Sequence, residues 1–320
     1  MISRVREARP VIHCITNYVT ANDVANILLA AGASPIMADG LREAEEISRL
    51  SQGLVLNLGT LKETAVEGML LAGRTAARLG HPVVLDPVGA GAAAFRRETA
   101  LRILKEVPCA VIRGNASEIR ALAWGLEEAE GPEGGGAVEA AGHEPEGSEA
   151  VGGTEREPET GGRVCCCGIG RAAEPARSRG VDVSEQETLT AENQEDTVFL
   201  VQALARRTGA VIVMTGEKDL VADGNKVCLV RNGHPMMSRL TGSGCMLDGI
   251  LAAFLAAKPD GETVLQQTAL AVSAYGICGQ LAFERTVESG GGTGSFRMYL
   301  IDAMSLLTDK DIRRMADIES

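Results

Sequence analysis

The sequence predicts an α/β protein whose mainly parallel central sheet is covered by helices on both faces. Short, continuous apolar strands alternate with helical segments along the chain, which is typical of parallel sheets. Aromatic residues make up only 3% of the chain, so Ala, Val, Leu and Ile supply most of the apolar surface. A length of 320 residues accommodates one large α/β domain or two small ones.

Each expected strand is a short apolar run, and several expected helices have a recognisable start or stop. Gly32 and Gly80 end the first two helices, because glycine readily adopts the left-handed conformation that closes a helix. Thr60 is expected to cap the second helix with its side-chain oxygen. A turn centred on Gly224 predicts a hairpin over 221–227. The expected strands are 11–15, 54–58, 82–87, 109–113 and 210–214, and the expected helices are 21–31, 60–79, one from 116, 197–207, and most of the chain from 245.

Residues 126–178 have a different composition from the rest of the chain. They contain 12 Gly, 12 Glu and 4 Arg with neither Lys nor Asp, so they carry −8 of the formal net charge of −12. Such a segment buries too little apolar surface to offset the entropy of ordering it. We therefore expect a disordered, low-complexity insertion within a single domain spanning 1–320. It is either a regulatory or docking segment or a passively tolerated insertion.

Charge and cysteine use argue against several classes of protein. A net charge of −12 disfavours nucleic acid as a partner, because a phosphate backbone requires a basic surface. The chain has no apolar run of 18 residues and no apolar region near its start, so neither a membrane helix nor a secretory signal is expected. Five of the eight cysteines are scattered, which indicates reduced thiols in the cytoplasm. The other three are adjacent, at 165–167, and are poorly placed to share one tetrahedral metal ion.

A glycine-rich loop at 241–245 is the most informative motif. It opens an apolar helix, so the backbone N–H groups of Gly242, Ser243 and Gly244 are expected to point toward a phosphate or other anion and form an anion hole. Cys245 lies in the same electric field, which is expected to lower the pKa of its thiol and favour the thiolate. The loop therefore predicts a site for a negatively charged group that is being transferred.

Polar residues follow several strands directly, at the edge where parallel α/β sheets bind ligands. Asn57, Asp86, Arg113 and Thr215 hold such positions. Each alone fits a turn or a helix cap, but several strands ending this way favour one shared site. Glu118 lies three residues after an Asn at the start of a helix, so both side chains share one helical face and can hold Mg²⁺ through water.

Seven segments of the chain together carry a family resemblance. They lie at 13–20, 32–37, 56–61, 85–91, 112–119, 214–219 and 241–245. In this order they resemble the hydroxyethylthiazole kinase family of the ribokinase-like superfamily, with the Asn-Ala-Ser-Glu and Gly-Ser-Gly-Cys blocks as the most specific parts. The resemblance implies a ribokinase-like three-layer α/β/α fold. It also implies Mg²⁺- and ATP-dependent phosphorylation of the hydroxyl of 4-methyl-5-(2-hydroxyethyl)thiazole in thiamine salvage, by a homotrimer with active sites at subunit interfaces.

The resemblance also implies contacts for individual residues. Met37, Gly242 and Asn17 correspond to positions that contact or surround the thiazole substrate. Arg113 and Thr215 correspond to positions that contact ATP.

Charge neutralisation and proton transfer fall to three other positions. Glu118 and Asp86 correspond to the acidic surroundings of the Mg²⁺–phosphate region. Cys245 takes the place of the aspartate base of other ribokinase-like kinases. It acts either as a base toward the alcohol or only as a positioning residue, because a dissociative transition state releases the alcohol proton late.

Three alternative functions remain open at the level of sequence. A ribokinase-like kinase for another small alcohol, such as hydroxymethylpyrimidine, would share most of these motifs. A cysteine hydrolase with Cys245 as the nucleophile would need a partner base, for which His13 and His234 are candidates. A thiazole or nucleotide sensor without catalysis is the third alternative, and the presence of Arg113, Glu118, Thr215 and Cys245 argues against it.

Overall fold

The computed structural model describes residues 1–130 and 193–320. Within those ranges, strands β1 to β9 form one sheet in the order β2-β1-β3-β4-β5-β6-β7-β8-β9. The pairs from β2 through β6 are parallel, and β7, β8 and β9 add antiparallel strands at one side. The predicted mainly parallel sheet is therefore confirmed. The strands are β1 (Val11–Ile15), β2 (Ser34–Met37), β3 (Gly53–Asn57), β4 (Val83–Asp86), β5 (Val111–Asn115), β6 (Val211–Thr215), β7 (Asp219–Ala222), β8 (Val227–Val230) and β9 (Ile318–Glu319).

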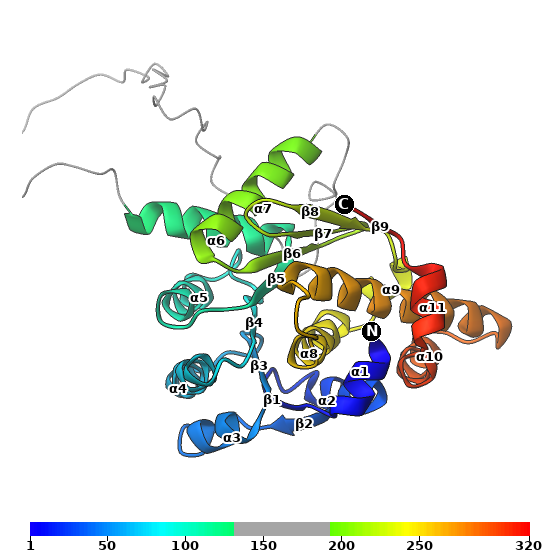
Figure 1. Cartoon of the computed structure of the whole chain (residues 1–320). Coiled ribbons are helices and arrows are strands. Elements are labelled where there is room, and N and C mark those ends of the chain that lie inside the picture. Colours follow the sequence, from blue (N-terminus) through cyan, green and yellow to red (C-terminus); the bar gives the residue numbers. More distant parts are fainter. Residues whose placement is uncertain (131–192) are drawn as a thin grey trace, which may run out of the picture.

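Helices cover both faces of the sheet, which gives a three-layer α/β/α arrangement (Figure 1). One layer contains α1 (Ile2–Ala8), α2 (Ala21–Ala31), α8 (Ser243–Ala256), α9 (Val264–Glu288), α10 (Thr293–Leu306) and α11 (Asp309–Met315). The other contains α3 (Ala44–Leu50), α4 (Glu63–Leu79), α5 (Ala94–Glu106), α6 (Ala116–Glu130) and α7 (Gln194–Thr208). A short 3₁₀ helix, η2 (Pro235–Arg239), precedes α8.

Alternate side chains of each central strand enter different apolar cores, because successive residues of a strand point to opposite faces. In β3, Val55 joins the core beneath α8, whereas Leu54 and Leu56 join the core beneath α4. Burial on both faces explains why these strands are continuous apolar runs.

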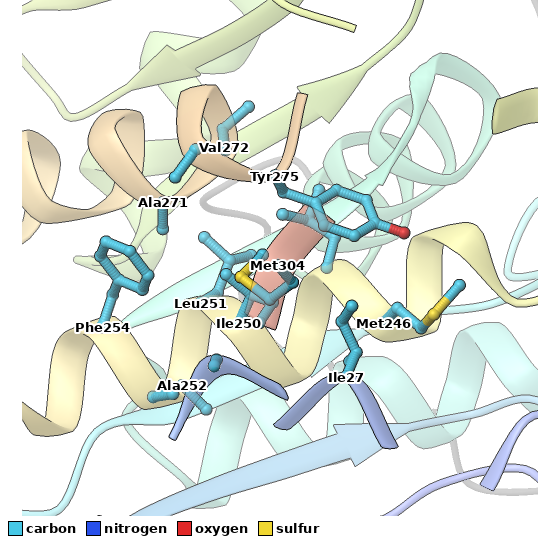
Figure 2. Close-up of a cluster of buried hydrophobic side chains, with 14 of the residues drawn as sticks. Ile27, Met246, Ile250, Leu251, Ala252, Phe254, Ala271, Val272, Tyr275 and Met304 are labelled. Carbon is cyan, nitrogen blue, oxygen red and sulfur yellow. The ribbon is translucent and has the colours of Figure 1, made fainter. Parts of the chain in front are cut away.

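Helix α8 lies at the centre of the first core, between the sheet and helices α2 and α9 (Figure 2). Leu251 and Phe254 of α8 pack with Ala271 and Val272 of α9 in this cluster. Every residue of α8 from 245 to 255 is buried. A helix that is packed on all sides holds its first turn in a fixed position, so the glycine-rich loop before it is rigidly placed.

Some predicted boundaries were wrong. Thr60 does not cap a helix: its φ of 47° places it in a left-handed turn, and α4 begins three residues later at Glu63. The predicted strand 54–58 is shifted by one residue, and the predicted helix 197–207 begins three residues earlier. No local sequence pattern had predicted α1, β2, α3, α5, η2 or β9.

The predicted insertion begins later than expected. Helix α6 continues to Glu130, five residues into the segment 126–178. Leu126 packs against the core beneath α4, and Glu127 forms an ion pair with Arg207 of α7 at 3.8 Å, so this end of the helix is held in place. The rest of the insertion, with the three adjacent cysteines, lies outside the described residues. The five described cysteines are free thiols, as predicted.

Candidate active site

The polar residues that follow the strands lie together at the carboxyl edge of the sheet. Asn57 is opposite Asp86 in the β3–β4 register, and its Nδ2 donates to Asp86 Oδ2 at 2.6 Å. Arg113 Nη1 donates to the same oxygen at 3.1 Å, and Arg113 Nη2 donates to Thr215 Oγ1 at 3.3 Å. The structure therefore joins four strand ends into one site, as the sequence predicted.

The glycine-rich loop lies directly against this group. Gly242 is the N-cap of α8 with φ of 87°, and a Cβ there would lie 2.9 Å from Thr20 Cβ. A Cβ on Gly244 would lie 2.6 Å from Arg113 Cζ and closer still to the two terminal guanidinium nitrogens. The fold requires glycine at 242, whereas a side chain at 244 would displace the Arg113 guanidinium, which covers the first turn of α8.

One part of the predicted anion hole is corrected by the structure. The N–H of Ser243 donates to the carbonyl oxygen of Leu240 at 3.2 Å, so it is already used. The N–H groups of Gly244 and Cys245 belong to the first turn of α8 and have no carbonyl four residues back within the helix. These two N–H groups lie at the positive end of the helix dipole, where an anion could accept from them; the Cys245 N–H was not part of the predicted anion hole.

Cys245 is buried among amides and carboxylates. Its Sγ accepts hydrogen bonds from Asn17 Nδ2 at 3.2 Å and Asn57 Nδ2 at 3.3 Å. Burial, followed by the negative charges of Asp86 and Asp248, raises the pKa of the thiol to about 12. The predicted lowering of this pKa was wrong, because the loss of solvent and the charges of the two carboxylates outweigh the Thr20 hydrogen bond and the charge of Arg113. Cys245 is therefore a neutral thiol near pH 7.

Asp248 is a site residue that the sequence analysis missed. It is fully buried one turn after Cys245, and its Oδ2 accepts from Asn57 Nδ2 at 3.2 Å. Its Oδ1 lies 3.9 Å from Arg113 Nη1. Burial raises the pKa of both Asp248 and Asp86, and in Asp86 the Asp248 charge adds to this effect. As the single charged residue in the apolar stretch 246–257, Asp248 carried a signal that was available in the sequence.

Glu118 is held by the backbone rather than by another side chain. Its two carboxylate oxygens accept from the N–H groups of Gly89 and Asn115, each at 2.9 Å. Asn115 Oδ1 accepts in turn from the Glu118 N–H at 2.9 Å, which closes the start of α6. Burial, and then the charge of Asp86, raises the pKa of Glu118 to about 7. Because burial and their mutual repulsion disfavour the charged forms of Asp86 and Glu118, a cation between them would stabilise both carboxylates.

Asn17 and Met37 have different surroundings. Asn17 Oδ1 accepts from the N–H and Oγ1 of Thr20 at 3.1 and 3.0 Å, so the amide is fixed beside Cys245. A small pocket beside Asn57 has Thr16 and Tyr18 in its wall, and the buried Thr16 Oγ1 has no hydrogen-bond partner there. Met37 lies outside this wall, at the end of edge strand β2, with 37% of its surface exposed.

The histidines proposed as bases for a hydrolase have other partners. His13 is buried, with Nδ1 2.9 Å from Ser48 Oγ and Nε2 2.9 Å from the Ala38 carbonyl oxygen. His234 Nδ1 accepts from the Met236 N–H, and its ring stacks on Phe283. Neither ring contacts Cys245, so the structure does not support a cysteine–histidine hydrolase.

The layers and the sheet order together define a ribokinase-like fold. A solved ribokinase-like superfamily protein from Enterococcus faecalis covers 95% of this chain and 88% of its own at a TM-score of 0.52 and 12% identity, which supports the fold alone. The model of the hydroxyethylthiazole kinase family matches residues 2–141 and 169–310, and this chain belongs to that family. The resemblance drawn from the seven segments is therefore confirmed.

Relatives named as hydroxyethylthiazole kinases match this chain over nearly its full length. It is 41% identical to a hydroxyethylthiazole kinase from Desulfovibrio desulfuricans, over 99% of this chain and 96% of the relative. It is 40% identical to one from Clostridium acetobutylicum, over 100% and 98%. The solved hydroxyethylthiazole kinase of Pyrococcus horikoshii is 32% identical with a TM-score of 0.72, over 99% and 96%. Among the described residues, no helix is long and apolar enough to cross a membrane.

Proposed function

We propose that this chain transfers the γ-phosphoryl group of ATP to the hydroxyl of 4-methyl-5-(2-hydroxyethyl)thiazole, as a step of thiamine salvage. The proposal rests on one observation: Arg113, the first turn of α8 and Cys245 lie close together at one edge of the sheet. Phosphoryl transfer depends mainly on positioning and charge neutralisation, and these groups supply both. Family membership supports the choice of the acceptor.

Arg113 and the first turn of α8 act on the transferring group. The N–H groups of Gly244 and Cys245 hold the oxygens of the γ-phosphoryl as negative charge develops on them. The guanidinium of Arg113, already packed over Gly244, neutralises the triphosphate, and Thr215 Oγ1 fixes one end of that guanidinium. The roles of Arg113 and Thr215 in ATP binding, and of Gly242 in shaping the loop, are part of this proposal.

Asp86 and Glu118 are the residues that would hold Mg²⁺, directly or through water. No N–H or O–H of another residue donates to the buried Asp86 Oδ1, so this oxygen suits an oxygen-seeking cation. Mg²⁺, when bound with the nucleotide, neutralises charge on the phosphate oxygens.

Cys245 positions the alcohol rather than removing its proton at the start. A thiol with a pKa of about 12 is not a base near pH 7. Asn17 and Asn57 donate to the sulfur and so direct it toward one orientation. The alcohol loses its proton late in a dissociative transfer, which requires no thiolate. The predicted thiazole contacts of Asn17, Met37 and Gly242 belong to this proposal.

The oligomeric state, location and domain organisation complete the proposal. We infer a homotrimer with active sites at subunit interfaces, a cytoplasmic location, and one kinase domain interrupted by the low-complexity insertion. The five free cysteines support a reducing compartment. The family model matches on both sides of residues 142–168, which supports one interrupted domain. Analytical ultracentrifugation tests the trimer, and a monomer that retains full activity contradicts shared active sites.

The experiment that tests the function measures ADP release from Mg·ATP by the full chain. Three reactions are compared, with hydroxyethylthiazole, with hydroxymethylpyrimidine, and without an acceptor. Thiazole-dependent ADP release is expected. Release only with hydroxymethylpyrimidine contradicts the proposed acceptor, and no release with either alcohol from folded protein contradicts a kinase function.

A further inference from the structure

Three potential metal ligands lie together beneath the glycine-rich loop at 241–245. One ligand atom from each of Asp86, Cys245 and Asp248 lies within 4.8 Å of the other two, and all three residues are buried. Cys245 and Asp248 are three residues apart on α8, so their side chains project from the same face of the helix. Asp86 approaches that face from the end of β4. The group therefore spans two rigid elements of the fold.

The hydrogen bonds from Asn57 and Arg113 leave one oxygen of each carboxyl group without a donor. Asn57 Nδ2 donates to Oδ2 of both Asp86 and Asp248, and Arg113 Nη1 donates to Oδ2 of Asp86. The Oδ1 atoms of the two aspartates are fully buried, and no N–H or O–H of another residue donates to them. The two carboxyl groups hydrogen-bond to each other, so they hold a proton between them. An unpaired buried acceptor costs about 1–3 kcal/mol, and more when it is charged. A divalent cation can replace the proton between the two carboxyl groups and contact both of them.

We propose that Asp86, Cys245 and Asp248 form a binding site for a thiophilic divalent cation such as Zn²⁺ or Cd²⁺. Three protein ligands with a thiolate and two carboxylates suit such a cation and leave a fourth position open. Mg²⁺ takes oxygen ligands and keeps several waters, so this site differs in chemistry from the Mg²⁺ position at Asp86 and Glu118. Asp248 distinguishes the two, because it contacts this cluster and has no part in the proposed Mg²⁺ site.

Binding exchanges a proton for the metal at sulfur. The S–H bond of Cys245 breaks and a sulfur–metal bond forms, while the proton between Asp86 and Asp248 is replaced by metal–oxygen bonds. Both protons pass to the buffer without any change of oxidation state. A metal ion at this position also occupies Asp86 and Cys245. If the proposed function is correct, it therefore blocks phosphoryl transfer and Zn²⁺ inhibits the enzyme.

The test is a titration of the full chain with Cd²⁺ alone, followed by the sulfur-to-metal charge-transfer absorbance in the ultraviolet. Cys165, Cys166 and Cys167 are first changed to Ser, because any of these thiols that takes up Cd²⁺ gives the same absorbance band. The expected result is one Cd²⁺ per chain, with protons released from Cys245 and from the Asp86–Asp248 pair in weak buffer. Neither ATP nor the thiazole is present, so a failure of the proposed function leaves the result unaffected.

Single substitutions test which residues bind the Cd²⁺. Cys245→Ser is expected to abolish the band, and Asp248→Asn to weaken Cd²⁺ binding by at least tenfold. Cys228→Ser is the matched control and should leave both unchanged, since Cys228 lies away from the cluster on β8. If Asp248→Asn does not fold, Asp248→Ser provides the same test with a smaller side chain. The absence of a stoichiometric band, unchanged affinity on loss of Asp248, or loss of the band in Cys228→Ser overturns the proposal.

Discussion

Replacing Gly244 with Ala tests whether the guanidinium packed over the glycine-rich loop is used in catalysis. Gly244 is the second residue of α8 and has no positive φ, so its backbone accepts alanine without strain. In a helix, alanine is favoured over glycine by about 0.5–1 kcal/mol. The new Cβ would lie 2.6 Å from Arg113 Cζ, whereas an ordinary contact begins at 3.4 Å. The guanidinium must therefore move by about 1 Å.

The size of the effect follows from that displacement. The ion pair with Asp86 at 3.1 Å and the hydrogen bond to Thr215 at 3.3 Å cannot both survive such a shift. A misplacement of about 1 Å in a catalytic site typically costs about 100-fold in rate, or about 2.7 kcal/mol of transition-state stabilisation. We expect kcat/KM for ATP to fall by about this factor while Tm changes little. Steady-state kinetics and thermal unfolding measure the two quantities.

Gly294→Ala is the matched control. Gly294 is also the second residue of a helix, α10, and a Cβ there has no atom within 4 Å. It should keep full activity. If Gly244→Ala retains kcat/KM within about threefold of the unchanged protein, the position of Arg113 over the loop does not contribute to phosphoryl transfer. A large fall in Tm instead shows that the substitution acts through folding, which also refutes the reasoning.

Three further predictions concern acid–base behaviour and the insertion. Burial raises the pKa of Glu118 from 4.5 to about 7, so the folded chain retains a proton that the unfolded chain has lost. Its contribution to stability therefore falls by up to about 3 kcal/mol as the pH rises from about 4.5 to 7, and urea denaturation should show a weaker decline for Glu118→Gln. Cys245→Ala should lower kcat about tenfold with little change in ATP affinity, and an unchanged kcat removes the thiol from the mechanism. Replacing 142–168 by a short Gly-Ser linker should leave thiazole-dependent ADP release intact, and loss of folded protein would show that this segment belongs to the domain.

The sheet and the convergence of its strand ends were predictable because local patterns determine both. A continuous apolar run followed by a polar residue marks the end of a buried strand, and parallel strands bring those ends to one edge. Asn57, Asp86, Arg113 and Thr215 were placed correctly on this basis alone. The short helices α1 and α3 and the polar α5 lack a strong apolar stripe, so their existence depends on tertiary packing that periodicity does not reveal.

The electrostatics of the site were not predictable from local sequence. The dipole of α8 acts on Cys245 through neighbouring residues, whereas Asp86 reaches the thiol from β4, far away in the sequence. Only the packed structure shows that burial and the carboxylates together raise the pKa of the thiol. Thr60 failed as a helix cap for a related reason, since its left-handed conformation is part of the turn that carries the chain across the edge of the sheet.

The outer strand β2 restricts how two copies of the chain can meet. The N–H of Ser34 points to β1, where it donates to the Pro10 carbonyl oxygen, so the nitrogen of the next residue, Pro35, points away from the sheet. Proline has no N–H, and this side of the strand therefore lacks a donor at its middle. A neighbouring backbone cannot continue the hydrogen-bonded ladder there. Association across this edge therefore depends on side chains such as the exposed Met37 rather than on backbone hydrogen bonds. Backbone pairing can repeat without end and build a fibre, whereas specific side-chain contacts are compatible with a closed assembly.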